Sequence, residues 1–273
     1  MNQHQAVARE PCANKPSYKV LGVRVDAVQI PDVVNQMECW IKERRGTHYI
    51  AVTGMHGISE AQEDGTFKII LNSADLVVPD GMPLVWLGRL RGFSLRRRVY
   101  GPELMLTFCE QTSCRSYRHF LYGGAPGVAE QLAETLRTRF AGIQVAGSYS
   151  PPFRPLRGEE RREVVAMISR LRPDVVWVGL STPKQERWMH EYRKEIDVPV
   201  MVGVGAAFDL NSGRMKQAPA WMREHGFEWF YRLLQEPLRL WRRYLVFGPK
   251  FLGNVILELL GLKTFEWQKG EKR

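Results

Sequence analysis

The stretch "ADLVVPDGMPLVW", residues 74–86, contains a strand, a turn and the start of a helix. An apolar, strand-like run ends at Asp80, Gly81 follows it, and helical spacing begins near Met82. Asp80 is therefore expected at the carboxyl end of a strand. Taken alone, these residues fit a turn or N-cap aspartate as well as a carboxylate that acts on a substrate.

The same alternation of short apolar runs and longer amphipathic runs extends along the chain. Strands are expected at 18–25, 48–53, 75–80, 119–124, 143–148, 174–180 and 199–205, and helices at 31–45, 55–72, 82–91, 101–114, 125–140, 159–171, 183–196 and 216–226. This pattern predicts an α/β fold with a Rossmann-like, mostly parallel sheet and helices on both faces. Ligands of such folds bind at the carboxyl ends of the strands.

Composition divides the chain into three parts: a disordered leader at 1–17, an α/β core at 18–220 and a C-terminal appendage at 221–273. The appendage holds 10 Lys and Arg against 6 Asp and Glu, and 11 of the chain's 29 aromatic residues. Pro237 and Pro249 are each expected in the first turn of a new helix. We therefore predict two or three short, basic amphipathic helices.

The formal net charge of +10 over 273 residues predicts an anionic partner, namely nucleic acid, a phosphorylated ligand or an acidic membrane surface. The polar N-terminus does not resemble a signal peptide, and no apolar run reaches the roughly 18 residues that a spanning helix needs. The four cysteines lack zinc-site spacing. These features predict a cytoplasmic protein.

Other strand ends carry further candidate ligand-binding residues. Thr53 ends the run "HYIAVT" and either contacts a ligand or N-caps the next helix. Gly123 and Gly124, followed by a helix, form either a diphosphate cradle or a tight turn. The sequence there is not Gly-x-Gly-x-x-Gly, which weakens any dinucleotide interpretation.

The segment from Thr182 to Gln185 has the form of a capping box with Pro183 in the first helical position. Lys184 and Gln185 would also face a ligand at that helix end. Downstream, Gly205 completes a lone Gly-x-Gly, and Asp209 either binds a hydroxyl of the ligand or caps a loop.

Two groups of arginines stand out. Arg98 is the last of five arginines between residues 89 and 98, most of which are expected on a solvated or membrane-facing surface. In the appendage, Arg232, Arg239 and Arg242 would share one face of a continuous helix, as a phosphate clamp or simply as a basic face.

Together these motifs resemble the WecG/TagA/CpsF family of bacterial glycosyltransferases. The resemblance covers about residues 19–247 and rests on six stretches in the family's order: "NSADLVVPDGMPLVW", "RRRVYGPELM", "YGGAPGVAEQLAETL", "VWVGLSTPKQERWM", "VGVGAAFDLNSGRMKQAPAWM" and "EWFYRLLQEPLRLWRRYL". It implies inverting transfer of a sugar from a UDP-sugar to a polyprenyl-diphosphate-linked sugar, in the synthesis of cell-wall glycopolymers, capsule or exopolysaccharide. It also implies an appendage that engages the inner face of the plasma membrane.

The resemblance assigns roles to residues of this chain. Asp80 matches the proposed base and Thr53 the family's strand-end threonine. Donor-binding positions match the group Gly123, Gly124, Lys184, Gln185, Gly205, Asp209 and Arg98, and the appendage arginines match Arg232, Arg239 and Arg242. Met55 and His56, and likewise Pro102 and Glu103, depart from the family pattern at positions that could line the donor or acceptor pocket.

The expected chemistry needs no metal, because no Asp-x-Asp lies among the candidate strand ends and arginines could stabilise the leaving UDP. The transferred sugar is expected to be glucose, N-acetylmannosamine or its uronate, and a homo-oligomer is possible. The alternatives are an NAD-dependent oxidoreductase, a nucleic-acid-binding module and a non-catalytic membrane-bound scaffold. The first lacks the dinucleotide fingerprint and the second a recognised motif.

Overall fold

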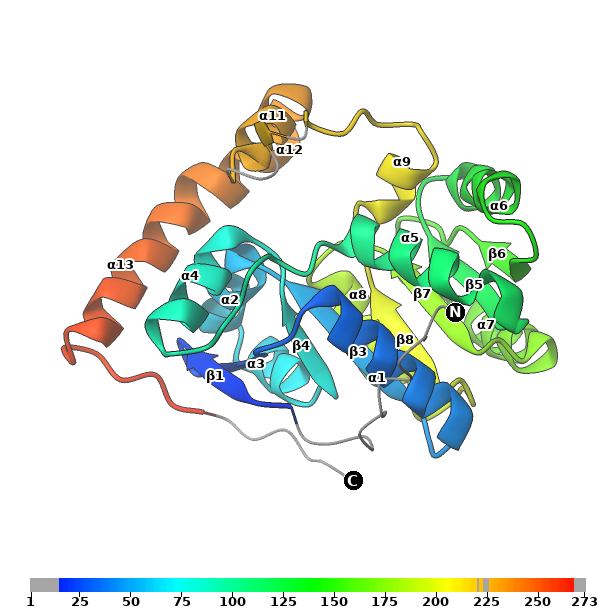
Figure 1. Ribbon diagram of the computed structural model, residues 1–273, viewed down its shortest axis with the longest axis horizontal. Helices are drawn as coiled ribbons and strands as arrows, with labels where there is room; N and C mark the ends of the chain where they lie inside the picture. The colour runs from blue at the N-terminus through cyan, green and yellow to red at the C-terminus, as the bar shows by residue number, and fades with distance from the viewer. Residues whose placement is uncertain (1–14, 220, 223–225, 268–273) are drawn as a thin grey trace, which may run out of the picture.

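The computed structural model describes residues 15–219, 221–222 and 226–267, with the side chain of Arg239 excepted (Figure 1). Residues 1–14 of the expected leader lie outside this description. So do residues 220 and 223–225 of the expected helix 216–226, and residues 216–219 of that helix have no helical structure.

A six-stranded sheet forms the centre of the core, and every neighbouring pair in it is parallel, as expected. The strand order is β4-β3-β8-β7-β5-β6. The bounds are β3 (His48–Thr53), β4 (Leu76–Pro79), β5 (Arg118–Gly123), β6 (Gln144–Tyr149), β7 (Val175–Gly179) and β8 (Val200–Gly203). Asp80 therefore directly follows an edge strand of this sheet.

Helices cover both faces of the sheet, because its strands alternate apolar side chains between two cores. One core includes Tyr49 and Val77 and packs on α2 (Met55–Glu63), α3 (Gly65–Asn72), α7 (Gly158–Leu171) and α8 (Lys184–Tyr192). The other includes Ile50 and Val78 and packs on α1 (Ile30–Glu43), α5 (Gly101–Thr112), α6 (Val128–Arg139) and α9 (Ala207–Asn211). α4 (Met82–Leu90) and the short 3₁₀ turn η1 (Ser113–Arg115) complete the core.

Two expected elements are divided in the structure. The expected strand 18–25 is an antiparallel hairpin of β1 (Ser17–Val20) and β2 (Val23–Asp26), because Leu21 and Gly22 turn with positive φ angles of 49° and 73°. The expected helix 55–72 breaks at Asp64, whose carboxylate accepts from the Phe67 amide at 3.0 Å and so begins α3.

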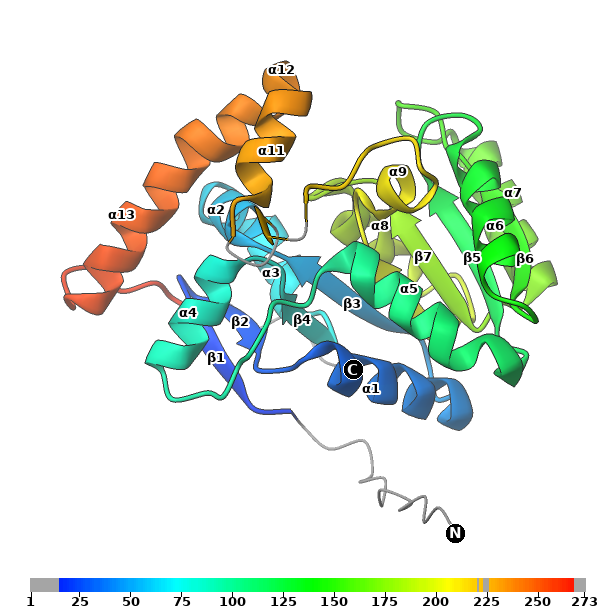
Figure 2. The same cartoon turned by 45° about the horizontal axis from the view of Figure 1, so that its top comes forward.

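The appendage contains α11 (Glu228–Gln235) and then an uninterrupted helical run (Figures 1 and 2). That run consists of α12 (Pro237–Trp241), the π-helical turn η2 (Arg242–Val246) and α13 (Phe247–Leu259). Pro237 begins α12, as predicted. Pro249 lies in the first turn of α13 and lacks the N–H that an α-helix would use there, which accounts for the π turn just before it.

α13 packs along α2 of the core. Phe247, Phe251 and Val255 are buried, and their spacing of four places them on one face of the helix. Burial of each such side chain contributes about 1.5–3 kcal/mol. The appendage is therefore fixed to the α2 side of the sheet, close to the carboxyl end of β3.

Candidate active site

Thr53 and Asp80 lie side by side where β3 and β4 end. The Asp80 amide donates to the Thr53 carbonyl oxygen at 2.8 Å. Gly54 permits this approach, because a Cβ atom at that position would lie 2.3 Å from the Asp80 carbonyl oxygen. The backbone therefore holds Asp80 at the strand-end edge independently of its side chain.

The Asp80 carboxylate is not used as a helix cap. The N-cap of α4 is Gly81, which has a φ of 120° and no side chain with which to cap the helix. The Asp80 side chain is 28% exposed, but its Oδ1 is buried and has no hydrogen-bond partner among the described residues. Burial raises the pKa of Asp80 above its ordinary value, and the charge of Arg98 opposes the rise. Such a carboxylate can accept a proton from a hydroxyl group.

Arg98 stands between Asp80 and the appendage. Its Nη1 lies 3.8 Å from Asp80 Oδ1, and its Nη2 pairs with the carboxylate of Glu228 on α11. The Tyr100 hydroxyl donates to Glu228 at 2.5 Å, and the Arg98 guanidinium lies 4.1 Å from the Tyr100 ring centroid. The sequence motifs pointed to Arg98 but not to Glu228. A glutamate in the first turn of a helix is common, and the residues around Glu228 in the sequence give no sign of a further role.

Thr53 is buried, and its Oγ1 has no hydrogen-bond partner among the described residues. The N-cap of α2 is Gly54, without a side-chain bond, so Thr53 does not cap that helix. A Cβ atom on Gly57 would lie 2.1 Å from Thr53 Oγ1, so α2 closes directly over this hydroxyl.

Gln185 connects two strand-end loops. Its amide Nε2 donates to Glu186 at 3.0 Å, and its Oε1 accepts from the Gly205 amide at 3.0 Å. The capping-box expectation is wrong, because the Thr182 hydroxyl donates to Glu186 at 2.8 Å and α8 has no side-chain cap. Burial raises the pKa of Glu186, against the hydrogen bonds from Gln185 and Thr182.

The expected glycine cradle has a packing reason of its own. A Cβ atom on Gly123 would lie 2.6 Å from the backbone of Gly179, and Gly124 donates to the Gly179 carbonyl at 3.1 Å. Glycine at 123 is therefore required by the close approach of β5 and β7, whereas glycine at 124 is favoured by its φ of 75° and by Val128, which a Cβ there would approach to 3.0 Å. The same turn leads into α6, whose N-cap is Gly127.

Two expected donor-binding residues lie outside this hydrogen-bonded network. Lys184 is exposed at the start of α8. Asp209 is the third residue of α9 and not a loop cap, since the N-cap is Ala206. Its carboxylate lies 4.0 Å from Arg214.

The appendage arginines do not share the single helix face that the sequence predicted. The charges of Arg232 and Arg243, like that of Arg98, oppose the rise that burial causes in the pKa of Asp80, so both arginines lie in the neighbourhood of the site. Arg242 is exposed, and its charge instead opposes the burial that raises the pKa of Glu60 on α2. The helix break at Glu236 and the π turn change how the arginines are rotated about the helix axis. As a result, Arg243 rather than Arg242 lies on the side that faces the site. The side chain of Arg239 lies outside the description.

Of the residues that depart from the family pattern, Met55, His56 and Pro102 pack within the protein and the Glu103 side chain is 38% exposed. The Met55 methyl lies beside Gly248 of α13, and His56 contacts the Phe247 ring with centroids 5.3 Å apart. Burial lowers the pKa of His56 to about 3. Pro102 and Glu103 form the first turn of α5. Met55 and His56 therefore belong to the contact between α2 and the appendage.

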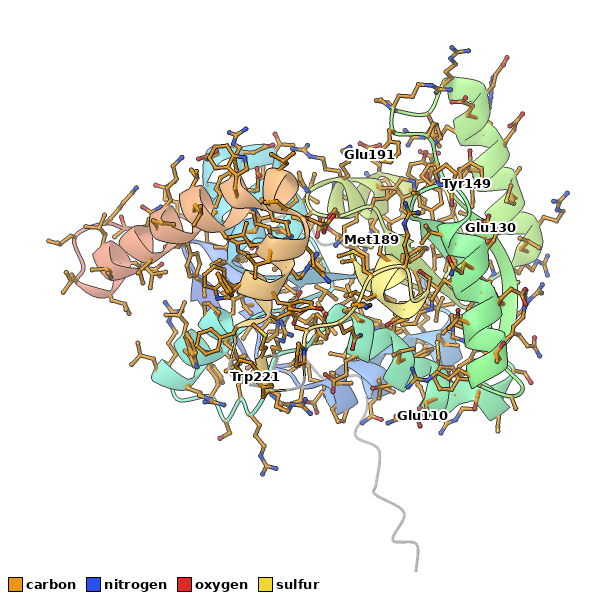
Figure 3. All side chains as sticks on the ribbon, turned by 90° about the horizontal axis from the view of Figure 1, so that it is seen from above. Glu110, Glu130, Tyr149, Met189, Glu191 and Trp221 are labelled. Carbon is orange, nitrogen blue, oxygen red and sulfur yellow. The ribbon has the colours of Figure 1, made fainter. Side chains whose placement is uncertain are left out.

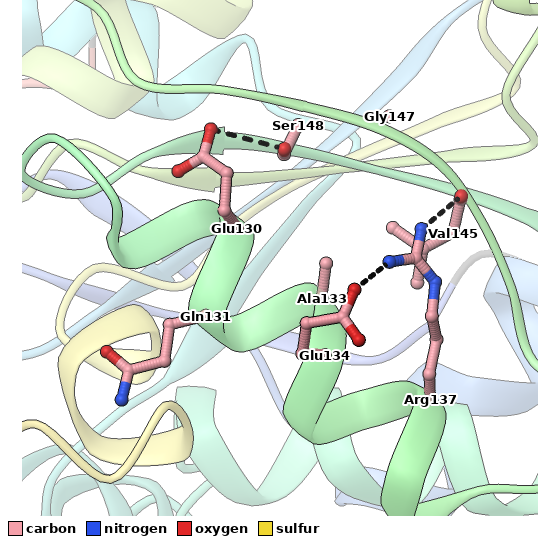
Figure 4. Close-up of a pocket in the computed structure, with 8 residues that line it drawn as sticks. All are labelled: Glu130, Gln131, Ala133, Glu134, Arg137, Val145, Gly147 and Ser148. Atoms are coloured by element: carbon pink, nitrogen blue, oxygen red, sulfur yellow. Dashed lines mark hydrogen bonds and ion pairs between the residues drawn. The ribbon is translucent and has the colours of Figure 1, made fainter.

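A pocket of about 300 Å³ lies elsewhere, between α6 and β6 (Figure 4). Glu130 and Ser148 interact across it, as do Arg137 and Val145. β6 is the edge strand opposite β4, and Figure 3 shows Glu130 and Tyr149 on the side of the molecule away from the appendage helices. This pocket is thus separate from the Asp80 site. Among the described residues, no group of three or more His, Cys, Asp or Glu side chains has the arrangement of a metal site.

Comparison with known proteins gives a consistent result. A model of the glycosyl transferase WecG/TagA/CpsF family matches residues 18–264. A protein of Bacillus spizizenii is 33% identical over 84% of this chain and 86% of its own, and one of Bacillus subtilis is 34% identical over 78% and 80%. One of Staphylococcus aureus (strain MW2) is 27% identical over 85% and 90%. All three are named N-acetylglucosaminyldiphosphoundecaprenol N-acetyl-beta-D-mannosaminyltransferase.

Proposed function

The chain belongs to the WecG/TagA/CpsF family and is a glycosyltransferase, and we propose that it transfers a sugar from a UDP-sugar to a polyprenyl-diphosphate-linked N-acetylglucosamine. The acceptor follows the names of the similar Bacillus and Staphylococcus proteins. Those names also favour N-acetylmannosamine over glucose or N-acetylmannosaminuronate as the transferred sugar. The product would enter the synthesis of a cell-wall glycopolymer or a related polysaccharide.

The observation that carries this proposal is the Asp80 carboxylate at the strand-end edge, whose pKa is raised by burial. In the proposed step, Asp80 accepts the proton of the acceptor hydroxyl as that oxygen forms a bond to the anomeric carbon. The bond from the anomeric carbon to the diphosphate breaks, and UDP leaves with the electron pair. Attack from the face opposite the leaving group inverts the anomeric configuration.

The departing diphosphate needs positive charge, and we assign this role to the appendage. Arg232 and Arg243 are close enough to act on the pKa of Asp80, and Arg232 Nε is buried without a hydrogen-bond partner among the described residues. Guanidinium groups match phosphate oxygens well. On this basis the proposed reaction proceeds without a metal ion, and a chelator such as EDTA should leave its rate unchanged.

We further propose that the appendage and α4 lie against the inner face of the plasma membrane. None of the described helices is both long and apolar enough to cross a bilayer. Instead, large apolar side chains are exposed on α13 and just after it, and on α4: Leu252, Ile256, Leu259, Leu260, Leu262, Trp86 and Leu90. Arg91, at the end of α4, and Glu258, on α13, pair at 3.1 Å and join the two groups. Arg89 on α4 and Lys263 after α13 are exposed as well and add positive charge. An exposed surface that is both apolar and basic binds the interface of an anionic membrane.

The decisive experiment is a donor panel with the full purified chain. UDP-N-acetylmannosamine, UDP-glucose and UDP-N-acetylmannosaminuronate are each incubated with a short-chain lipid-diphosphate N-acetylglucosamine, and the disaccharide product is followed by mass spectrometry. We expect product with UDP-N-acetylmannosamine. Product with another of the three would correct the donor, and no product with any of them would overturn the proposal.

A further inference from the structure

Glu228 is an acidic residue of the appendage at the centre of the site. It lies in the first turn of α11 and is only 5% exposed. Figure 2 shows α11 reaching from the appendage toward the edge where β3 ends. A carboxylate so deeply buried requires partners, and Arg98 and Tyr100 of the core provide them.

Arg98 is shared unequally between two carboxylates. Its Nη2 hydrogen-bonds to Glu228, while its Nη1 remains 3.8 Å from Asp80, beyond hydrogen-bond length. Tyr100 strengthens the contact with Glu228 through its hydroxyl, at 2.5 Å. The core arginine is thus turned toward the appendage, and Oδ1 of Asp80 is left without a hydrogen bond among the described residues.

We propose that Glu228 is a positioning residue that holds Arg98 away from Asp80, so that docking of the appendage leaves the Asp80 carboxylate free to accept the proton of the acceptor. This inference rests on the proposed glycosyl transfer and on the assignment of Asp80 as its base. Glu228 itself contacts neither substrate in this scheme. It acts through Arg98.

The charges that face Asp80 come from three elements. Arg98 lies in the loop after α4, Glu228 and Arg232 belong to α11, and Arg243 belongs to the π turn. Burial is the largest cause of the raised pKa of Asp80, and Glu228 is the carboxylate that adds to it. Without the Glu228 charge, Arg98 would pair more closely with Asp80, and the pKa of Asp80 would fall.

The test compares Glu228→Gln with Glu258→Gln. Glu258 is a matched control, because it is also an appendage carboxylate paired with a core arginine, Arg91, but on α13 and α4. For each variant, kcat and KM for the UDP-sugar are measured across pH, and hydrogen exchange of α11 amides is followed in the absence of substrate. Tyr100→Phe is a milder variant that removes one hydrogen bond to Glu228 and keeps every charge.

For Glu228→Gln we expect kcat to fall by about 10-fold with KM within about 2-fold, as for a displaced catalytic group. The acidic limb of the kcat/KM profile should move to lower pH, and α11 amides should exchange faster. Tyr100→Phe should speed exchange in α11 to a smaller extent, and Glu258→Gln should leave the pH profile in place.

An unchanged acidic limb in Glu228→Gln, with kcat near that of the natural chain, would overturn the inference. Failure of the proposed function has a different signature, since the natural chain would then form no product. Hydrogen exchange still decides in that case whether Glu228 holds α11 on the core, because it needs no turnover.

Discussion

The amide of Asp80 donates to the carbonyl oxygen of Thr53 at 2.8 Å, so the ends of β4 and β3 are joined through backbone atoms. The position of residue 80 is therefore set by the sheet and by the small size of Gly54, not by interactions of the aspartate side chain. Changes to the carboxylate can for this reason be separated from changes to the fold.

Asp80→Asn should abolish most of the transfer activity while the protein stays folded. A general base contributes about 100-fold or more to a rate, and asparagine cannot accept the proton. The melting temperature should not fall, because burial already disfavours the charged form of Asp80 and asparagine carries no charge. Turnover near that of the natural chain would show that Asp80 is not the base.

Gly57→Ala should destabilise the α2 end of the site by about 1–3 kcal/mol, as overpacking does. The added Cβ would lie 2.1 Å from Thr53 Oγ1. Thermal unfolding measures the loss, and the double variant Thr53→Ala with Gly57→Ala should recover much of it. Gly158→Ala is the control, since a Cβ there meets nothing within 4 Å. Equal effects at both glycines would contradict the contact.

Arg243→Ala should reduce kcat/KM by about 10-fold or more, whereas neighbouring Arg242→Ala should stay within about 2-fold. The difference follows from the π turn, which directs the Arg243 charge toward Asp80 and the Arg242 charge toward Glu60. A loss of 10-fold corresponds to about 1.4 kcal/mol of transition-state stabilisation. If Arg242→Ala instead had the larger effect, Arg242 would lie on the face that acts on the substrate, as the sequence predicted.

Stability should fall as the pH is lowered through the range in which histidines become protonated in the unfolded chain. His119 is buried, accepts from Trp177 Nε1 at 3.0 Å, and has its pKa lowered by burial from 6.5 to about 4. Since the unfolded chain takes up the proton first, stability is complete above pH 6.5 and declines toward pH 4, by on the order of 2 kcal/mol at pH 5. Urea unfolding at pH 7.5 and 5.0 measures this.

His119→Asn provides the control for that measurement, because it removes the titrating ring and retains an acceptor for Trp177. The difference in unfolding free energy between the two pH values should shrink in this variant. An undiminished difference would assign the pH dependence to other groups, among them His56, whose pKa burial lowers to about 3.

Replacing Leu252, Ile256 and Leu259 with serine should weaken binding to vesicles that contain anionic lipid. All three are at least 47% exposed on α13, so the core packing of Phe247, Phe251 and Val255 is left intact. Deleting residues 221–273 is a poorer test, because it uncovers α2. Phe153→Ser, at an 87% exposed site after β6, is the control for lost surface hydrophobicity. Vesicle sedimentation unaffected by the triple change would place the membrane contact elsewhere.

The sheet was predictable because each strand is a short apolar run between amphipathic helices, and parallel strands bring their carboxyl ends to one edge. The placement of Asp80 beside Thr53 follows from that rule together with the order of the motifs. The hairpin was not predictable in the same way, since "YKVLGVRV" has the pattern of one continuous strand and its reversal depends on Leu21 adopting a positive φ.

The appendage side of the site also escaped prediction. Placing Arg232, Arg239 and Arg242 on one face assumed a continuous helix with 3.6 residues per turn, whereas the structure ends α11 at Gln235 and winds residues 242–246 as a π turn. Glu228 escaped notice because its importance lies in two partners, Arg98 and Tyr100, that are more than 120 residues away along the chain. Long-range pairing of this kind leaves no local pattern.

The π turn also makes the orientation of the appendage depend on the number and winding of residues 242–246. If residues 242–246 returned to ordinary α-helical winding with none removed, everything before them would rotate by about 90° relative to everything after them, because a π turn takes up about one residue more than an α turn. Phe247 and its companions could then remain on α2 only if Arg232 turned away from the sheet edge. Removing one residue from 242–246 at the same time would restore the relation between the two parts, so the extra residue of the π turn couples the anchoring of the tail on α2 to the direction of its arginines.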